Sequence, residues 1–150
     1  MSKAFVNEDT LGPVESLPDR EISPHANLVT AEGLAQIEAT IARLQKEHNN
    51  DGSSIDAQSV ARDLRYWIAQ RATAQLTADS DASQVKFGSR VTVESDDGRR
   101  DIFRIVGMDE ADPKRGTLSY VSPLAQALID REVGDVVEVG GKRRKIVGIA

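Results

Sequence analysis

Residues 91–106 read VTVESDDGRRDIFRIV, and this stretch decides the fold of the C-terminal half of the chain. Apolar and polar side chains alternate on both sides of Asp97-Gly98, a dipeptide that favours a tight β-turn. A period of two places successive side chains on opposite faces of a strand. The stretch therefore predicts a β-hairpin, with residues 91–94 on its first strand and 102–106 on the return strand.

More strand signals follow the hairpin, with a single helix signal among them. Residues 117–121 read as a strand, and Ser122-Pro123 offers an N-cap and a first-turn proline for a short helix. Residues 136–139 and 142–149 flank Gly140-Gly141 and predict a closing hairpin. Residues 85–150 are thus expected to form an α+β domain, an antiparallel sheet with one short helix packed on it.

The N-terminal half carries a different pattern. Leu34, Ile37, Ile41 and Leu44 recur at spacings of three and four, and Thr30 is suitably placed to cap the helix that they predict. The polar run 48–54 predicts a turn, after which a second amphipathic helix is expected from about Ser54–Asp56 to about Leu76. Two such helices predict an antiparallel α-helical hairpin with arms about 30 Å long.

These patterns divide the chain into four parts. Residues 1–27 combine three prolines with few large apolar groups and are expected to form a flexible tail, with a docking peptide through Phe5, Val6 or Leu17 as the alternative. Within the second helix, Trp67 is expected in the seam of the hairpin, while Tyr66 or Arg65 could instead contact a partner. The expected boundaries are a tail at 1–27, a hairpin at 28–78, a linker at 79–84 and a C-terminal domain at 85–150.

Composition excludes several classes of protein. The 150 residues contain no cysteine, which removes thiol catalysis, disulfides and Cys-ligated metals. His25 and His48 lack neighbouring ligands and read as surface residues. The net charge of −5 argues against a protein that coats nucleic acid. No stretch is apolar enough for a signal peptide or a membrane span, so we expect a cytoplasmic protein.

The negative charge is unevenly distributed along the chain. Residues 1–84 carry 7 basic and 13 acidic side chains, whereas residues 85–150 carry 12 basic and 11 acidic ones. The acidic half is therefore the predicted hairpin with its tail, and the predicted C-terminal domain is nearly neutral.

Two charged motifs have both a functional and a structural interpretation. Asp109-Glu-Ala-Asp112 matches a helicase motif, but no phosphate-binding loop precedes it, so we interpret it as a connection between strands. The basic run at residues 142–145 would suit contact with nucleic-acid phosphates. Because side chains on a strand alternate between faces, a solvated edge strand is the favoured interpretation.

Four blocks of the C-terminal half resemble the C-terminal domain of the GreA/GreB transcript-cleavage factors, in order and at the spacing of that family. They are residues 85–93 (VKFGSRVTV), 105–112 (IVGMDEAD), 122–129 (SPLAQALI) and 133–137 (VGDVV). Residues 29–34 (VTAEGL) are similar to the start of the coiled coil of the family. The resemblance implies an FKBP-like C-terminal domain and an N-terminal antiparallel coiled coil.

The resemblance also implies a function and a partner. Members of the family bind bacterial RNA polymerase, their C-terminal domain docking on the rim of the secondary channel and their coiled coil entering it. The expected docking residues here are Tyr120, Val121, Ser122 and Pro123, and Val121 stands where many relatives carry a polar residue. The protein is thus expected to be a monomeric regulator of transcription elongation, with only indirect contact to nucleic acid and no cofactor of its own.

The tip of the hairpin departs from the family pattern. Relatives place acids there that help hold a second Mg²⁺ in the active site of the polymerase. This chain lacks their tip motif, and Glu47, Asp51 and Asp56 are the acids that could substitute, with Asp51 or Asp56 sharing a transient Mg²⁺. Because the arms are also shorter by several turns, stimulation of cleavage is doubtful and occupancy of the channel alone is the open alternative.

A rival interpretation makes the protein an enzyme. The FKBP-like fold that the resemblance implies also occurs in peptidyl-prolyl isomerases, which need an aromatic pocket for proline. The C-terminal domain offers only Phe87, Phe103 and Tyr120, and at least one phenylalanine is expected in the core. We therefore expect a protein that is not itself an enzyme.

Overall fold

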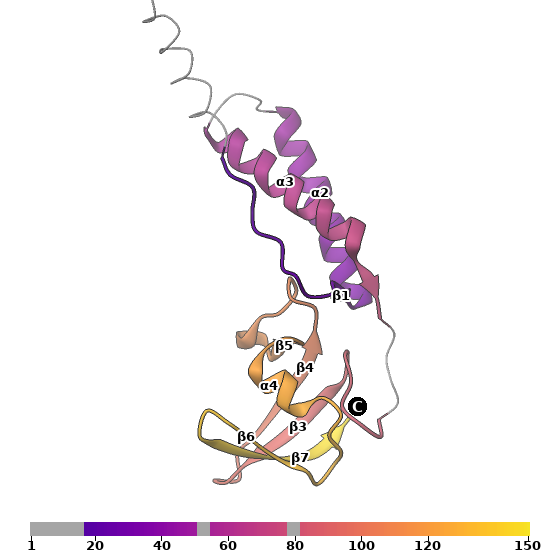
Figure 1. Cartoon of the computed structure of the whole chain (residues 1–150), viewed down its shortest axis with the longest axis vertical. Coiled ribbons are helices and arrows are strands. Elements are labelled where there is room, and N and C mark those ends of the chain that lie inside the picture. The colour runs from indigo at the N-terminus through magenta and orange to yellow at the C-terminus, as the bar shows by residue number, and fades with distance from the viewer. Residues whose placement is uncertain (1–16, 51–54, 78–81) are drawn as a thin grey trace, which may run out of the picture. The chain divides into compact units, whose positions relative to one another are not determined.

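The computed structural model describes residues 17–50, 55–77 and 82–150 (Figure 1). They fall into two compact units, each described here by itself. The first takes its residues from 1–24 and 37–73, and the second from 25–36 and 74–150.

Two long helices, α2 (Ala31–Asn50) and α3 (Ile55–Thr73), run antiparallel to each other (Figure 1). Ile37, Ile41 and Leu44 are between 2% and 4% exposed, which confirms the predicted apolar stripe of the first helix. Trp67 on α3 is only half buried. The helical hairpin is thus present as predicted, and its buried seam is carried mainly by aliphatic side chains of α2.

The predicted end of the second helix at Leu76 is wrong. Helix α3 ends at Thr73, and β2 (Gln75–Leu76) pairs in parallel with β1 (Leu28–Val29). The backbone N–H of Gln75 donates to the carbonyl of Asn27 at 2.8 Å, and that of Thr77 donates to the carbonyl of Val29 at 3.0 Å. Because each strand is only two residues long and its partner is distant in sequence, local periodicity carries no sign of it.

The second unit contains a five-stranded sheet in the order β5-β4-β3-β7-β6. Antiparallel pairing joins β3 to β4, β3 to β7 and β6 to β7. One short helix, α4, accompanies the sheet, as predicted. The bounds are β3 (Arg90–Ser95), β4 (Arg100–Val106), β5 (Thr117–Ser119), α4 (Pro123–Leu128), β6 (Val136–Val139) and β7 (Lys142–Ile149).

Both predicted hairpins are confirmed, and their apolar residues form one core. Gly98 has a φ of +84° in the turn between β3 and β4, where a residue with a β-carbon would be strained. The core lies between the sheet and α4. Its fully buried members include Val91, Val93, Ile105, Leu128 and Ile146.

Two details of the predicted sheet are corrected. The sheet is mixed, because β5 pairs in parallel with β4. The connection over residues 107–116, which includes the 3-10 helix η1 (Pro113–Arg115), brings the chain back so that β5 runs in the direction of β4. Strand β7, which carries the basic run 142–145, is not an edge strand, because it pairs with both β3 and β6.

The sequence predicts a flexible tail over residues 1–27, and residues 1–16 lie outside the described part of the chain. Two of the described tail residues contact α3: Asp19 pairs with Arg65 at 2.7 Å, and Arg20 pairs with Asp63 at 3.5 Å. Among the helices that the structure describes, none combines the length and the apolarity that crossing a membrane requires.

Candidate functional site

The predicted docking residues lie on the turn between β5 and α4. Ser122 is the N-cap of α4, with its Oγ accepting a hydrogen bond from the backbone N–H of Ala125 at 3.3 Å, and Pro123 occupies the first helical position. A side-chain cap and a proline with a fixed φ together define where this helix begins. The structure therefore brings all four predicted residues, Tyr120 to Pro123, together on one well-defined turn.

Tyr120 anchors this turn from within. Its hydroxyl donates to the carbonyl of Ala26, and its ring meets Phe87 edge-on with centroids 5.8 Å apart. Its own carbonyl accepts from Nε2 of Gln126 at 2.6 Å. Burial raises the pKa of the Tyr120 phenol above its ordinary value. Tyr120 is thus a positioning residue for the turn, and Pro123 is the member that is exposed.

The predicted tip acids are not brought together by any described contact. Glu47 is exposed near the end of α2, and its carboxylate pairs with Arg43 one turn earlier at 3.0 Å. Asp51 lies outside the described residues, and Asp56 is the second residue of α3. Within the described part of the chain, no three acidic or histidine side chains are grouped so that they could hold a metal ion.

Glu110 has a role that the sequence interpretation missed. One carboxylate oxygen accepts from the backbone N–H of Thr30 at 3.1 Å and from that of Gly107 at 3.2 Å, and the other accepts from the Thr30 hydroxyl at 2.6 Å. The Thr30 hydroxyl in turn accepts from the N–H of Gly33 at 3.0 Å. We call Thr30, Gly33, Gly107 and Glu110 the Glu110 clamp.

Thr30 caps α2 as predicted, since its hydroxyl accepts from the N–H of Gly33, and Glu110 supplies the other half of a capping box by accepting from the N–H of Thr30. In a capping box, an acid or amide three residues after the N-cap bonds back to its N–H. That position is Gly33, and a β-carbon there would lie 2.1 Å from Oε2 of Glu110. A glycine at the position where a capping box carries glutamate or glutamine is the signal available in the sequence, because glycine permits the close approach of another group.

Arg104 on β4 makes a second contact with the start of α2. Its Nη2 lies 3.3 Å from Oε2 of Glu32. The backbone N–H of Glu32 itself, followed by the charge of Arg104, lowers the pKa of the Glu32 carboxyl below its ordinary value. The charged form of Glu32 also suits the first turn of a helix, where the macrodipole favours an anion.

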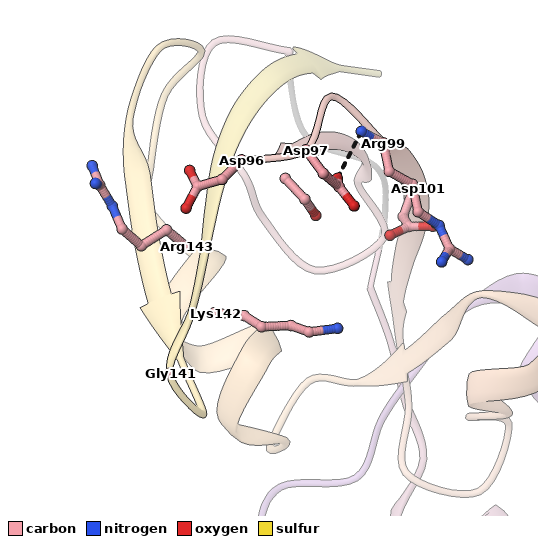
Figure 2. Close-up of a pocket in the computed structure, with 8 residues that line it drawn as sticks. Asp96, Asp97, Arg99, Asp101, Gly141, Lys142 and Arg143 are labelled. Carbon is pink, nitrogen blue, oxygen red and sulfur yellow. Dashed lines mark hydrogen bonds and ion pairs between the residues drawn. The ribbon is translucent and has the colours of Figure 1, made fainter.

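A pocket of about 390 Å³ lies at the turns of the two hairpins (Figure 2). Its charged lining mixes both signs, and the backbone N–H of Arg99 donates to the Asp97 carboxylate at 3.0 Å. No aromatic residue lines it. Its lining residues are Ser95, Asp96, Asp97, Arg99, Asp101, Gly141, Lys142 and Arg143.

The aromatic residues that a prolyl isomerase site would need are placed elsewhere. Phe87 is 8% exposed within the core, and Phe103 and Tyr120 are half buried against that core. The structure thus uses these three side chains for packing, and neither the pocket at the hairpin turns nor a smaller one of about 280 Å³ beside it includes any of them.

Comparison with known proteins matches the C-terminal half to a family. Residues 80–149 match the family model described as the C-terminal part of the transcription elongation factor GreA/GreB. Two solved structures are also similar. The GreA factor homolog 1 of Thermus thermophilus is 18% identical, with 84% of this chain and 99% of that chain covered and a TM-score of 0.42. GreA/GreB from Nitrosomonas europaea is 17% identical, with coverage of 83% and 98% and a TM-score of 0.43.

Curated relatives extend the match beyond the C-terminal half. The transcription elongation factor GreA of Methylobacterium nodulans is 42% identical over 55% of this chain, and that of Sinorhizobium medicae is 44% identical over 45%. The chain spans about half the length of these two proteins, 56% and 46% respectively. GreA of Desulfovibrio desulfuricans is 30% identical over 81% of this chain and 92% of its own length. The chain belongs to the GreA/GreB family.

Proposed function

We propose that this protein regulates transcription elongation by binding bacterial RNA polymerase at its secondary channel. The C-terminal domain docks on the rim through residues 120–123, and the helical hairpin enters the channel. The names of the curated relatives, transcription elongation factor GreA, support the general role. The family match over residues 80–149 includes the whole proposed docking turn.

The docking proposal rests on one observation, that the turn at residues 120–123 is held in a single conformation. Ser122 and Pro123 define the start of α4, and Tyr120 holds the turn from the inside through three groups: its hydroxyl, its ring and its carbonyl. A surface that is already held in one conformation loses little conformational entropy on binding. The exposed proline of a rigid turn is therefore well suited to contact a partner.

We further propose that the hairpin occupies the channel without strongly stimulating RNA cleavage. Such stimulation requires a carboxylate that reaches the catalytic metal and helps hold a second Mg²⁺. Glu47 is engaged with Arg43, and the two helices, of 20 and 19 residues, are each about 30 Å long at 1.5 Å per residue. If the tip does reach the metal, Asp51 or Asp56 is the residue that shares the Mg²⁺. The protein itself supplies no catalytic residues in this proposal and acts as a monomer in the cytoplasm.

Replacing Pro123 with glutamate is expected to weaken binding to core RNA polymerase at least about 10-fold, as measured by biolayer interferometry. Glutamate is favourable in the first turn of a helix, so the variant keeps α4 while it changes the docking surface. Val136→Glu is the matched control, because it makes the same charge change at a residue that is 45% exposed on β6. Equal affinities of Pro123→Glu and the wild type, or no complex with polymerase at micromolar protein, would refute the docking proposal.

A backtracked elongation complex supplied with Mg²⁺ tests the proposal that the hairpin occupies the channel without strongly stimulating RNA cleavage. We expect the wild-type protein to accelerate cleavage of the RNA less than about twofold, and Asp51→Ala and Asp56→Ala to leave that rate unchanged. The readout is the release of short RNA on a denaturing gel, with a cleavage-competent GreA as positive control. Prompt cleavage that either substitution abolishes would show that the tip reaches the metal. Binding of polymerase, measured separately, would still stand in that case.

A further inference from the structure

Residues 17–24 are joined to α3 by reciprocal charge pairs at Asp19 and Arg20. Asp19 pairs with Arg65 at 2.7 Å, and the next residue, Arg20, pairs with Asp63 at 3.5 Å. An acid followed by a base on this segment thus meets a base and an acid on the helix. We call residues 17–24 the strap.

Arg20 contacts an aromatic face and a carboxylate on α3, and that carboxylate, Asp63, also pairs with Arg62 at 3.3 Å. The guanidinium carbon of Arg20 lies 3.8 Å from the ring centroid of Tyr66 and 5.8 Å from that of Trp67. The two rings meet edge-on with centroids 5.1 Å apart, and Asp63 lies one turn earlier on the same face of α3. An aromatic face combined with a carboxylate is an arrangement that recognises arginine through cation–π contact and charge.

The strap is held only weakly, which allows it to leave this site. The side chain of Asp19 is 73% exposed and that of Arg20 is 38% exposed, so salt and water weaken both ion pairs. Ile22, a large apolar residue of the strap, is 50% exposed and adds little burial.

We propose that Asp63, Arg65, Tyr66 and Trp67 form a binding site for an extended segment of a partner protein that carries an Asp-Arg pair, and that the strap is its built-in competitor. The strap shows the chemistry that the site accepts. A competing segment would place its arginine over the Tyr66 ring beside Asp63 and its acid beside Arg65. This site includes none of residues 120–123, and it does not rest on the polymerase proposal.

Tethering gives the strap an advantage over any free segment. The strap is followed closely by residues 26–29, which are held by Tyr120 and β2, and a short tether gives an effective concentration on the order of millimolar. A free segment that binds the empty site with a dissociation constant of about 0.1 mM would therefore appear about 10-fold weaker on the intact protein. Only a partner segment that binds the site more strongly, or is present at higher concentration, would therefore displace the strap.

Trp67 is the only tryptophan of the chain, so its fluorescence reports directly on this site. The probe is a synthetic peptide with the sequence of residues 17–24, Leu-Pro-Asp-Arg-Glu-Ile-Ser-Pro, titrated into the full-length protein. We expect Arg20→Ala to change the Trp67 emission by vacating the site, and the peptide to reverse that change in a saturable way. Its apparent affinity should be at least about 10-fold higher for Arg20→Ala than for the wild type.

Three controls make the result specific. Glu21→Ala changes an exposed neighbour in the strap and should behave as the wild type does. A peptide in which alanine replaces the arginine should not bind to Arg20→Ala. Adding Asp63→Asn to Arg20→Ala should weaken binding of the original peptide at least about fivefold, while circular dichroism confirms that the helices remain.

The proposal is overturned if folded Arg20→Ala shows no saturable response to the peptide, or if the peptide without arginine binds equally well. If Arg20→Ala does not fold, Asp19→Arg provides the same test, because it sets two like charges against each other at Arg65 and leaves the arginine site intact. An unchanged affinity of Asp19→Arg for the peptide, relative to the wild type, would overturn the proposal as well.

Discussion

Replacing Glu110 with alanine is expected to lower the free energy of unfolding by about 3 kcal/mol. The substitution leaves the N–H groups of Thr30 and Gly107 without their carboxylate acceptor at buried positions, and the loss of such partners costs about 1–3 kcal/mol each. Urea unfolding followed by circular dichroism measures the effect. Glu132→Ala, at an exposed acid of the same unit, should change stability by less than about 0.5 kcal/mol.

Gly33 supplies a sharper control for the same prediction. The three heavy atoms nearest to a β-carbon built at Gly33 all belong to the Glu110 side chain, the first at 2.1 Å. Gly33→Ala should therefore destabilise the wild type, because it displaces the carboxylate. In the Glu110→Ala background it should instead stabilise the protein, since alanine is about 1 kcal/mol more favourable than glycine within a helix. An effect of the same sign in both backgrounds would contradict the Glu110 clamp.

Gly107→Ala is the second substitution from which we expect a large loss, about 2–3 kcal/mol. A β-carbon at Gly107 would lie 2.4 Å from the carbonyl oxygen of Leu28 and 3.2 Å from Oε2 of Glu110. The closer obstacle is backbone, which cannot rotate away as a side chain can. We therefore expect the pairing of β1 with β2 to loosen, and hydrogen exchange at Gln75 and Thr77 to accelerate along with the loss of global stability.

Gly148→Ala is the matched control for that loss. Its β-carbon would meet only side-chain atoms of Thr92 at 3.6 and 3.7 Å, which is ordinary van der Waals contact. Stability within about 0.5 kcal/mol of the wild type is expected for this variant. If Gly107→Ala were as mild as Gly148→Ala, the close approach of Leu28 to Gly107 would be refuted.

Local patterns were sufficient to predict most of the fold. The alternation around Asp97-Gly98 and around Gly140-Gly141 predicted hairpins that the structure confirms, as did the stripe of Ile37, Ile41 and Leu44 for α2. In each case the residues that specify the element are close in sequence. The parallel pairings of β1 with β2 and of β4 with β5 depend on distant partners, which no local period reveals.

In the candidate site, too, the local interactions are predictable from the sequence and the long-range contacts are not. The Ser-Pro signal at residues 122 and 123 correctly predicted the cap and start of α4, because capping is a local interaction. The inward role of Tyr120 and the contact of Glu110 with Thr30 involve groups separated by long stretches of chain, so a single sequence did not reveal them. The sequence alone does not decide whether Arg65 and Tyr66 pack in the hairpin or contact a partner, and both contact the strap in this structure.

The first residues of α2, Ala31–Gln36, group with the C-terminal sheet, and this fixes where the chain can be cut and rejoined. A hybrid that exchanges arms between members of the family would have its crossover points between residues 24 and 25, between residues 36 and 37, and between residues 73 and 74. Grafting at the predicted linker, 79–84, would instead carry Thr30 away from Glu110. The part that can be exchanged is therefore residues 37–73 of the hairpin together with the strap. Residues 31–36, at the start of α2, belong to the C-terminal unit.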